Sequence, residues 1–153
     1  MTGKAEFNAE EWSVVAGAPL LGAMMVIAAE RGGSVRESVA VAREYAAARE
    51  RYEGELMSAL LATPPATAVK RPDGPDDLRA QATETLREAV AILERVGTED
   101  EVVEYKRFVF SLAESVARAH KEGGFLGMGG KEISPAEQAV LDEMAATLGS
   151  ARA

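Results

Sequence analysis

Apolar residues recur at steps of three and four along most of this chain. The clearest stripe follows residue 98 and consists of Val102, Tyr105, Val109, Leu112, Val116 and Ala119. A similar stripe in the preceding segment consists of Leu78, Ala82, Leu86, Ala89, Leu93 and Val96. Such spacing collects the side chains on one face of an α-helix, where they pack along neighbouring helices. Strand-forming residues occur only within this spacing. The pattern therefore predicts an all-α bundle.

Capping signals mark where the helices begin. A serine or threonine followed three residues later by glutamate, the pattern of a capping box, starts at Ser34, Thr98 and Ser134. Asn8 is a further N-cap candidate, because glutamates follow it in the first turn and favour the positive end of a helix. Asp76 begins another helix, which ends before a glycine. These five starts predict a bundle of about five helices.

Breaks in the helical pattern set the expected boundaries. The second helix ends either near Tyr52 or, past a glycine, at Leu61. Pro19 lies inside the first helix and lacks a backbone N–H, so we expect a kink or a break just before it. Residues 63–75 contain four prolines and predict a linker over the surface. Residues 123–133 form a Gly-rich loop before the last helix.

Length and composition exclude several classes of function. The 153 residues suit a single helical domain, residues 1–153. The 25 acidic and 17 basic residues give a net charge of -8, which disfavours nucleic-acid binding. The chain has no cysteine and one histidine. Disulfides, thiolate metal sites and mechanisms with two imidazoles are therefore excluded. The absence of cysteine fits a reducing cytoplasm, and we expect a cytoplasmic protein without a cofactor.

Residues 14–29 are uncharged and mostly apolar, as a membrane-spanning helix would be. The run is shorter than the ~20 residues of a spanning helix and is interrupted by Gly17, Pro19 and Gly22. The residues before it are acidic, whereas a signal peptide begins with basic ones. We therefore expect no membrane span, and a helix buried on most of its sides.

The Gly-rich segment 123–130 combines five glycines with Phe125, Leu126 and Met128. Glycine amides at a helix start can bind phosphate. The Walker spacing fails here, because Phe125 occupies the position of the first glycine and Glu132 that of the serine or threonine. Two interpretations remain. The apolar side chains plug the end of the bundle, or they stay exposed as a contact surface, a use to which methionine is suited.

The first helix contains a second candidate contact site. Its glycines allow close backbone approach, and Pro19 frees a carbonyl group. A pocket for an apolar ligand between helices is one interpretation, with Met24, Met25 and Trp12 as contact residues. Tight packing of a central helix is the other.

Acidic residues offer at most a weak metal site. Glu132 and Glu137 are the candidates near the last helix, although Glu137 also belongs to a capping box. A separate cluster at residues 99–104 is explained by its place at a helix start. His120 lies in a last turn, where a cation complements the helix dipole. We therefore expect no metal centre.

Two segments resemble small uncharacterised bacterial proteins that are all-α. The first is GGFLGMGGKEISPAEQAVLDEMAATLG at residues 123–149, and the second is EEW…APLLGAMMVIAAE at residues 10–30. The turn marked by Gly130, Ser134 and Glu137 is also similar to a turn in the tellurite-resistance TerB-like helical proteins. That likeness implies a helical fold, and in some members acidic metal ligands and a stress-related role.

These patterns favour a non-enzymatic protein. No nucleophile has a recognisable base beside it, as the serines lack the surrounding motif of a hydrolase. The narrow seam after residue 98 and the apolar loop are typical of interaction surfaces. We therefore expect a helical interaction module that self-associates or binds a protein partner. The alternative is a small-molecule or divalent-metal binding protein with a stress-related role.

Overall fold

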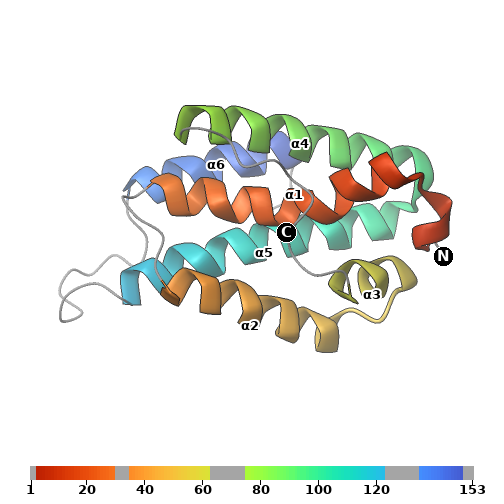
Figure 1. Cartoon of the computed structure of the whole chain (residues 1–153), viewed down its shortest axis with the longest axis horizontal. Helices are drawn as coiled ribbons and strands as arrows, with labels where there is room; N and C mark the ends of the chain where they lie inside the picture. The colour runs from red at the N-terminus through yellow and green to blue at the C-terminus, as the bar shows by residue number, and fades with distance from the viewer. Residues whose placement is uncertain (1–2, 30–34, 63–74, 123–134, 150–153) are drawn as a thin grey trace.

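The computed structural model describes residues 3–29, 35–62, 75–122 and 135–149, and all regular structure within them is helical. The predicted all-α bundle is confirmed. A short 3-10 turn, η1, precedes six α-helices (Figure 1). Their bounds are η1 Lys4–Glu6, α1 Ala9–Ala29, α2 Val35–Arg51, α3 Glu55–Ala62, α4 Pro75–Val96, α5 Glu99–Glu122 and α6 Pro135–Leu148.

Six helices appear in place of about five because the second predicted helix is two. α2 ends at Arg51 and α3 begins at Glu55, after the glycine at position 54. The Arg49 guanidinium donates to the Leu61 carbonyl oxygen from Nε at 3.1 Å and from Nη2 at 2.9 Å. This side chain therefore caps the C-terminal end of α3 and holds it against α2.

Two of the predicted helix starts are visible in atomic detail. Asn8 Oδ1 accepts from the Glu11 N–H at 2.8 Å, and Glu11 Oε2 accepts from the Asn8 N–H at 3.1 Å. At the start of α5, Thr98 Oγ1 accepts from the Glu101 N–H at 3.2 Å. Both caps satisfy backbone donors that a helix start leaves free. The caps at Ser34 and Ser134 lie outside the described residues.

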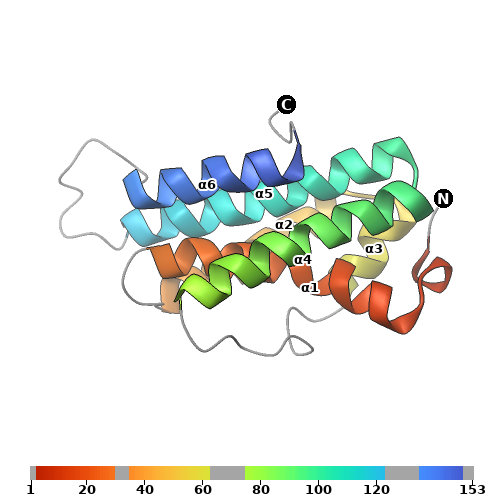
Figure 2. The same ribbon diagram turned by 90° about the horizontal axis from the view of Figure 1, so that it is seen from above.

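α1 lies at the centre of the bundle. It packs against α4, α5 and α6, while α2 packs mainly on α5, and α3 lies near η1 at one end (Figures 1 and 2). The helix is continuous through Pro19, so the alternative of a break is wrong. Figure 1 shows the two halves of α1 inclined to each other, as a proline within a helix requires.

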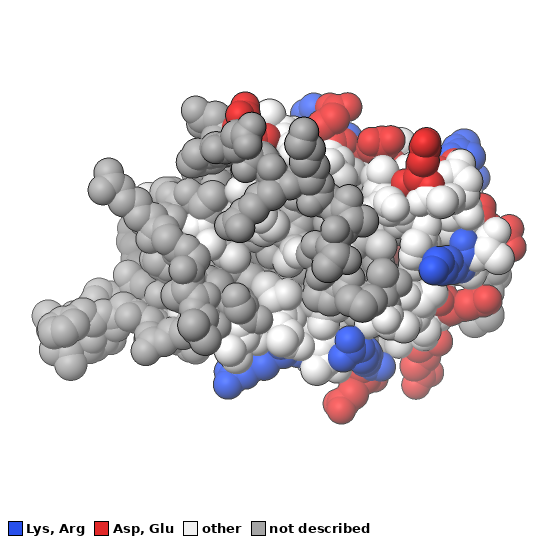
Figure 3. Space-filling view, in the orientation of Figure 1, with Lys and Arg blue, Asp and Glu red and all other residues white. Residues whose placement is uncertain are grey.

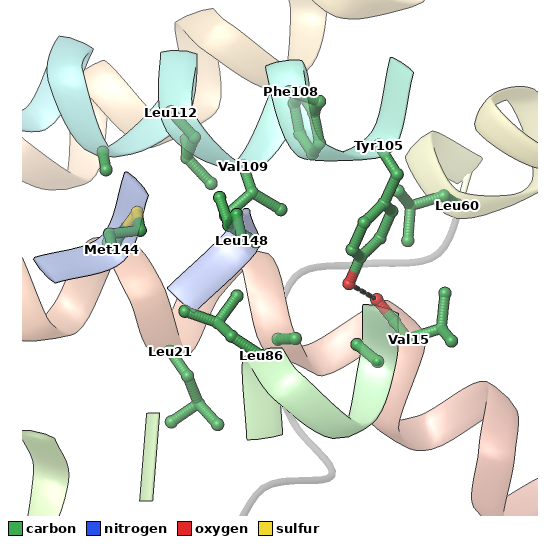
Figure 4. Close-up of a cluster of buried hydrophobic side chains, with 14 of the residues drawn as sticks. Val15, Leu21, Leu60, Leu86, Tyr105, Phe108, Val109, Leu112, Met144 and Leu148 are labelled. Atoms are coloured by element: carbon green, nitrogen blue, oxygen red, sulfur yellow. Dashed lines mark hydrogen bonds between the residues drawn. The ribbon is translucent and has the colours of Figure 1, made fainter. Parts of the chain in front are cut away.

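The core is built from the predicted stripes. The α5 stripe is buried from Val102 to Val116, and Ala119 is partly buried. It meets side chains of α1, α4 and α6 in the interior (Figure 4). The largest fully buried side chains are Tyr105, Phe108, Leu21, Leu56, Met57, Leu60, Leu61, Leu86, Leu93, Leu112, Leu141 and Met144. The α5 stripe, which we expected to be an interaction surface, is therefore buried in the core of the bundle.

By length and composition, α1 meets the criteria of a membrane-crossing helix over Ala9–Ile27, with a mean hydropathy of 1.3. Of that stretch, 56% is buried inside the protein. A core helix meets the same criteria, so they do not establish a membrane span. Its place among α4, α5 and α6 agrees with the expectation of a helix buried on most of its sides.

Candidate functional site

The space expected beside the freed carbonyl of α1 is filled. Pro19 has no N–H to donate to the carbonyl of Val15, four residues earlier. The hydroxyl of Tyr105, from α5, donates to that carbonyl oxygen instead at 2.7 Å (Figure 4). Both residues are fully buried. A side chain of the fold thus satisfies the carbonyl that Pro19 leaves without a donor in its own helix.

Small residues of α1 serve close packing in the same region. Gly22 is buried, and a Cβ atom placed there would lie 3.1 Å from Met144 Cε and 3.7 Å from Leu86 Cδ1. The glycine thus lets α6 and α4 approach the helix closely. Of the two interpretations of this part of α1, the structure supports tight packing.

The contact residues expected on α1 lie apart from one another. Trp12 is buried at its start against Phe7, with 5.5 Å between ring centroids, and its Nε1 has no partner among the described residues. Met25 is buried more than three turns further on, whereas Met24 is partly buried. Phe125, Leu126 and Met128 lie outside the described residues. No common site forms from the candidates that the structure describes.

The described residues contain no group of three or more histidine, aspartate or glutamate side chains that could hold a metal ion. Glu132 lies outside them, as does most of the turn that resembles the TerB-like proteins. Glu137 and His120 lie in α6 and α5, but their side chains are not described.

The two buried tyrosines, Tyr45 and Tyr105, are unsuited to proton transfer near neutral pH. Burial raises the pKa of Tyr45 to about 12, with a smaller opposing effect of Arg49. Burial, and then the nearby Tyr45, raise the pKa of Tyr105 well above its usual value of 10. Ser115 donates to the Glu44 carboxylate at 3.0 Å, a contact without an imidazole base. None of these groups forms a catalytic pair.

An open groove of about 440 Å³ lies between α4 and α6. Its lining carries two positive and two negative side chains and consists of Arg79, Ala80, Thr83, Glu84, Arg87 and Glu143. Arg79 is held across the groove by Glu143, whose Oε2 accepts from Nε at 2.6 Å and also from Nη2. Glu84 and Arg87 are exposed and form no ion pair within the described residues.

Thr83, one of the residues that line the groove, forms only a weak hydrogen bond. The Thr83 hydroxyl is partly buried and contacts the Met25 sulfur at 4.0 Å, the long distance of a weak bond. Met25, a contact candidate from sequence, thus lies beneath the groove without lining it.

Sequence reasoning missed this groove. The outward positions of α4 follow from its helical period, but which helix lies beside them does not. The only signal available in the sequence was the three-four spacing of the charged residues opposite the apolar stripe.

No protein family, curated protein or solved structure matches this chain.

Proposed function

We propose that this protein is a non-enzymatic helical interaction module that acts through self-association or by binding a protein partner. The observation that carries the proposal is the α4–α6 groove, where two arginines and two glutamates face outward on an otherwise acidic chain. Inside the described bundle, the space beside Pro19 is occupied and the tyrosines stay protonated at neutral pH. The groove, by contrast, presents charged side chains at the surface of the described structure.

The charge of the groove is compatible with a contact between two acidic chains. A chain of net charge -8 repels another acidic surface, which slows association and weakens the complex. The groove lining has equal numbers of positive and negative side chains. Figure 3 shows both acidic and basic side chains along the edge of the molecule where α4 lies. Such a face meets a partner of similar character without net repulsion.

Oligomeric state tests the self-association part of the proposal. Sedimentation velocity over a concentration series, from about 1 μM to about 1 mM, spans the affinities of weak and stable dimers. We expect the mass to rise with concentration and to fall again as salt screens the exposed charges. A monomer throughout this range leaves only a different protein as partner.

One observation favours the alternative of a small-molecule binder, because the groove volume falls within the range of ligand pockets. Thermal melts with Mg²⁺, Mn²⁺, Zn²⁺, phosphate and acetate test it, since a ligand of the native state raises the melting temperature by mass action. Arg87→Ala is the matched variant. A rise with phosphate or acetate that this variant abolishes, in a protein that stays monomeric, would replace the interaction module by a small-anion binder.

A further inference from the structure

We infer that the partner at the groove is a second copy of this chain, which crosses α4 of the first copy in antiparallel orientation. The inference rests on the proposed function and specifies its contact surface. It places Glu84 of each copy against Arg87 of the other.

The outward face of α4 carries a row of four exposed residues. Ala80, Glu84, Arg87 and Ala91 follow one another at steps of four, three and four, and all four are exposed. This spacing lines them up in one row along the helix. We call this row the α4 seam. Three of its residues also line the groove beside α6.

The order of residues in the α4 seam is self-complementary. The four positions are symmetric about a point between Thr85 and Leu86. A two-fold axis through that point therefore sets each alanine against the partner's other alanine, and each glutamate against the partner's arginine. An interface with two-fold symmetry repeats every contact, so two opposite-charge pairs form at once. In a parallel arrangement, arginine faces arginine and glutamate faces glutamate, so this complementarity is lost.

Side-chain size permits the crossing. Helices pack with their axes about 8–10 Å apart, and the shortest separations need small residues at the contact. The two alanines of the α4 seam supply them on both sides of the charged pair. The groove of about 440 Å³ beside the seam leaves room for side chains of the second copy. Arg79 is already paired with Glu143 and takes no part in the intermolecular pairs.

Both partners of the central pair are available. Neither Glu84 nor Arg87 forms an ion pair within the described residues. Nothing in that part of the chain therefore has to be broken before the intermolecular pairs form. Two pairs closed by one symmetric contact also share the entropy cost of association.

Charge reversal tests the pairing directly. Glu84→Arg and Arg87→Glu each set like charges opposite one another at both symmetric positions, and we expect dimer affinity to fall about tenfold or more. The double variant Glu84→Arg with Arg87→Glu restores both pairs with their signs exchanged and should dimerise like the wild type. The matched controls are Glu50→Arg and Arg43→Glu, exposed on α2, which make the same changes of net charge and should leave the affinity unchanged.

A mixing experiment gives an independent readout. Copies that carry Glu84→Arg bear two arginines in the α4 seam, and copies that carry Arg87→Glu bear two glutamates. Each alone should sediment as a monomer, and an equimolar mixture should form a heterodimer, because both cross-pairs are then attractive. Circular dichroism of each variant checks that its helices are kept.

The outcomes separate this inference from the proposed function. A wild type that dimerises, with single reversals that bind as tightly as the wild type and a mixture that shows no preference, overturns the α4 pairing and leaves self-association in place. A wild type that stays monomeric at every concentration overturns both the pairing and self-association. Loss of dimer in the α2 controls as well would show that net charge, not the α4 seam, governs assembly.

Discussion

α1 and α4 are helices of 21 and 22 residues that pack against each other, yet they relate to solvent in opposite ways. α1 is apolar around most of its circumference and is enclosed by three helices. α4 buries one stripe, which includes Ala82 and Leu86, and exposes charged residues on the other side. A helix that is apolar on all sides must be surrounded, whereas an amphipathic helix belongs at the surface.

The two helices also differ in the polar groups that they leave available to a partner. In α1 the carbonyl freed by Pro19 is satisfied by Tyr105 in the interior. In α4 the exposed Glu84 and Arg87 have no ion-pair partner in the described structure. A buried polar group that has its hydrogen-bond partner contributes to the stability of the fold. An exposed charge without an ion-pair partner is free to contribute to recognition. The first kind of group should respond to mutation in unfolding experiments and the second in association experiments.

The largest effect is expected where the two helices meet. Leu21 of α1 and Leu86 of α4 are both buried. Leu86→Ala should lower the free energy of unfolding by about 2–5 kcal/mol, through lost burial and the cavity left behind. Leu21→Ala should cost a similar amount. Urea unfolding followed by circular dichroism measures both. If both variants lost less free energy of unfolding than a substitution at an exposed position, the two helices would not form the core.

The next effect concerns the proline of α1. Tyr105→Phe should destabilise the fold by about 1–3 kcal/mol, because the buried Val15 carbonyl loses its donor. Pro19→Ala restores an N–H that can donate to the same carbonyl. In that background the cost of Tyr105→Phe should shrink, and a double-mutant cycle measures the difference. Equal costs in both backgrounds would mean that the hydroxyl does not compensate for the proline.

Alkaline pH provides a smaller test of the same interior. The folded state raises the pKa of Tyr45 from 10.0 to about 12, and burial also raises that of Tyr105 well above 10. The folded protein therefore retains protons that the unfolded chain loses, so stability is complete below pH 10 and falls as pH rises through about 12. Tyr45→Phe should make this fall shallower. It should cost little at neutral pH, because the buried hydroxyl has no partner among the described residues.

The smallest effect on stability is expected on the outer face of α4. Glu84→Arg and Arg87→Glu should each change the free energy of unfolding by less than about 0.5 kcal/mol at protein concentrations where the chain is a monomer. These are the variants expected to change dimer affinity most. Urea unfolding at about 1 μM protein measures the stability without the contribution of assembly. A large loss in this experiment would place the two residues among the structural ones.

Sequence reasoning reached most of the fold because its signals are local. The caps at Asn8 and Thr98 use side chains three residues apart, so their sequence contains both partners. The stripe of α5 likewise needs only the period of one helix. The division of the second predicted helix was left open, since it depends on Arg49 reaching a carbonyl twelve residues later.

The candidate site was less accessible to sequence reasoning. Met24, Met25 and Trp12 were grouped because they are close in sequence, but the turn of the helix points them to different surroundings. The α4–α6 groove was not foreseen, because it needs Glu143 beside Arg79, 64 residues away. No local pattern specifies that pairing.

The amino-acid sequence by itself determined that this protein is helical, where most helices begin, and which apolar residues share one face of a helix. These properties depend on hydrogen bonds and side-chain spacing within one or two turns. Only the tertiary structure decided that the α5 stripe is used inside the bundle, that Tyr105 satisfies the carbonyl freed by Pro19, and that charged side chains of α4 and α6 share a groove. Each of these depends on contacts between helices far apart in the chain, and the free energy of such contacts is set by packing.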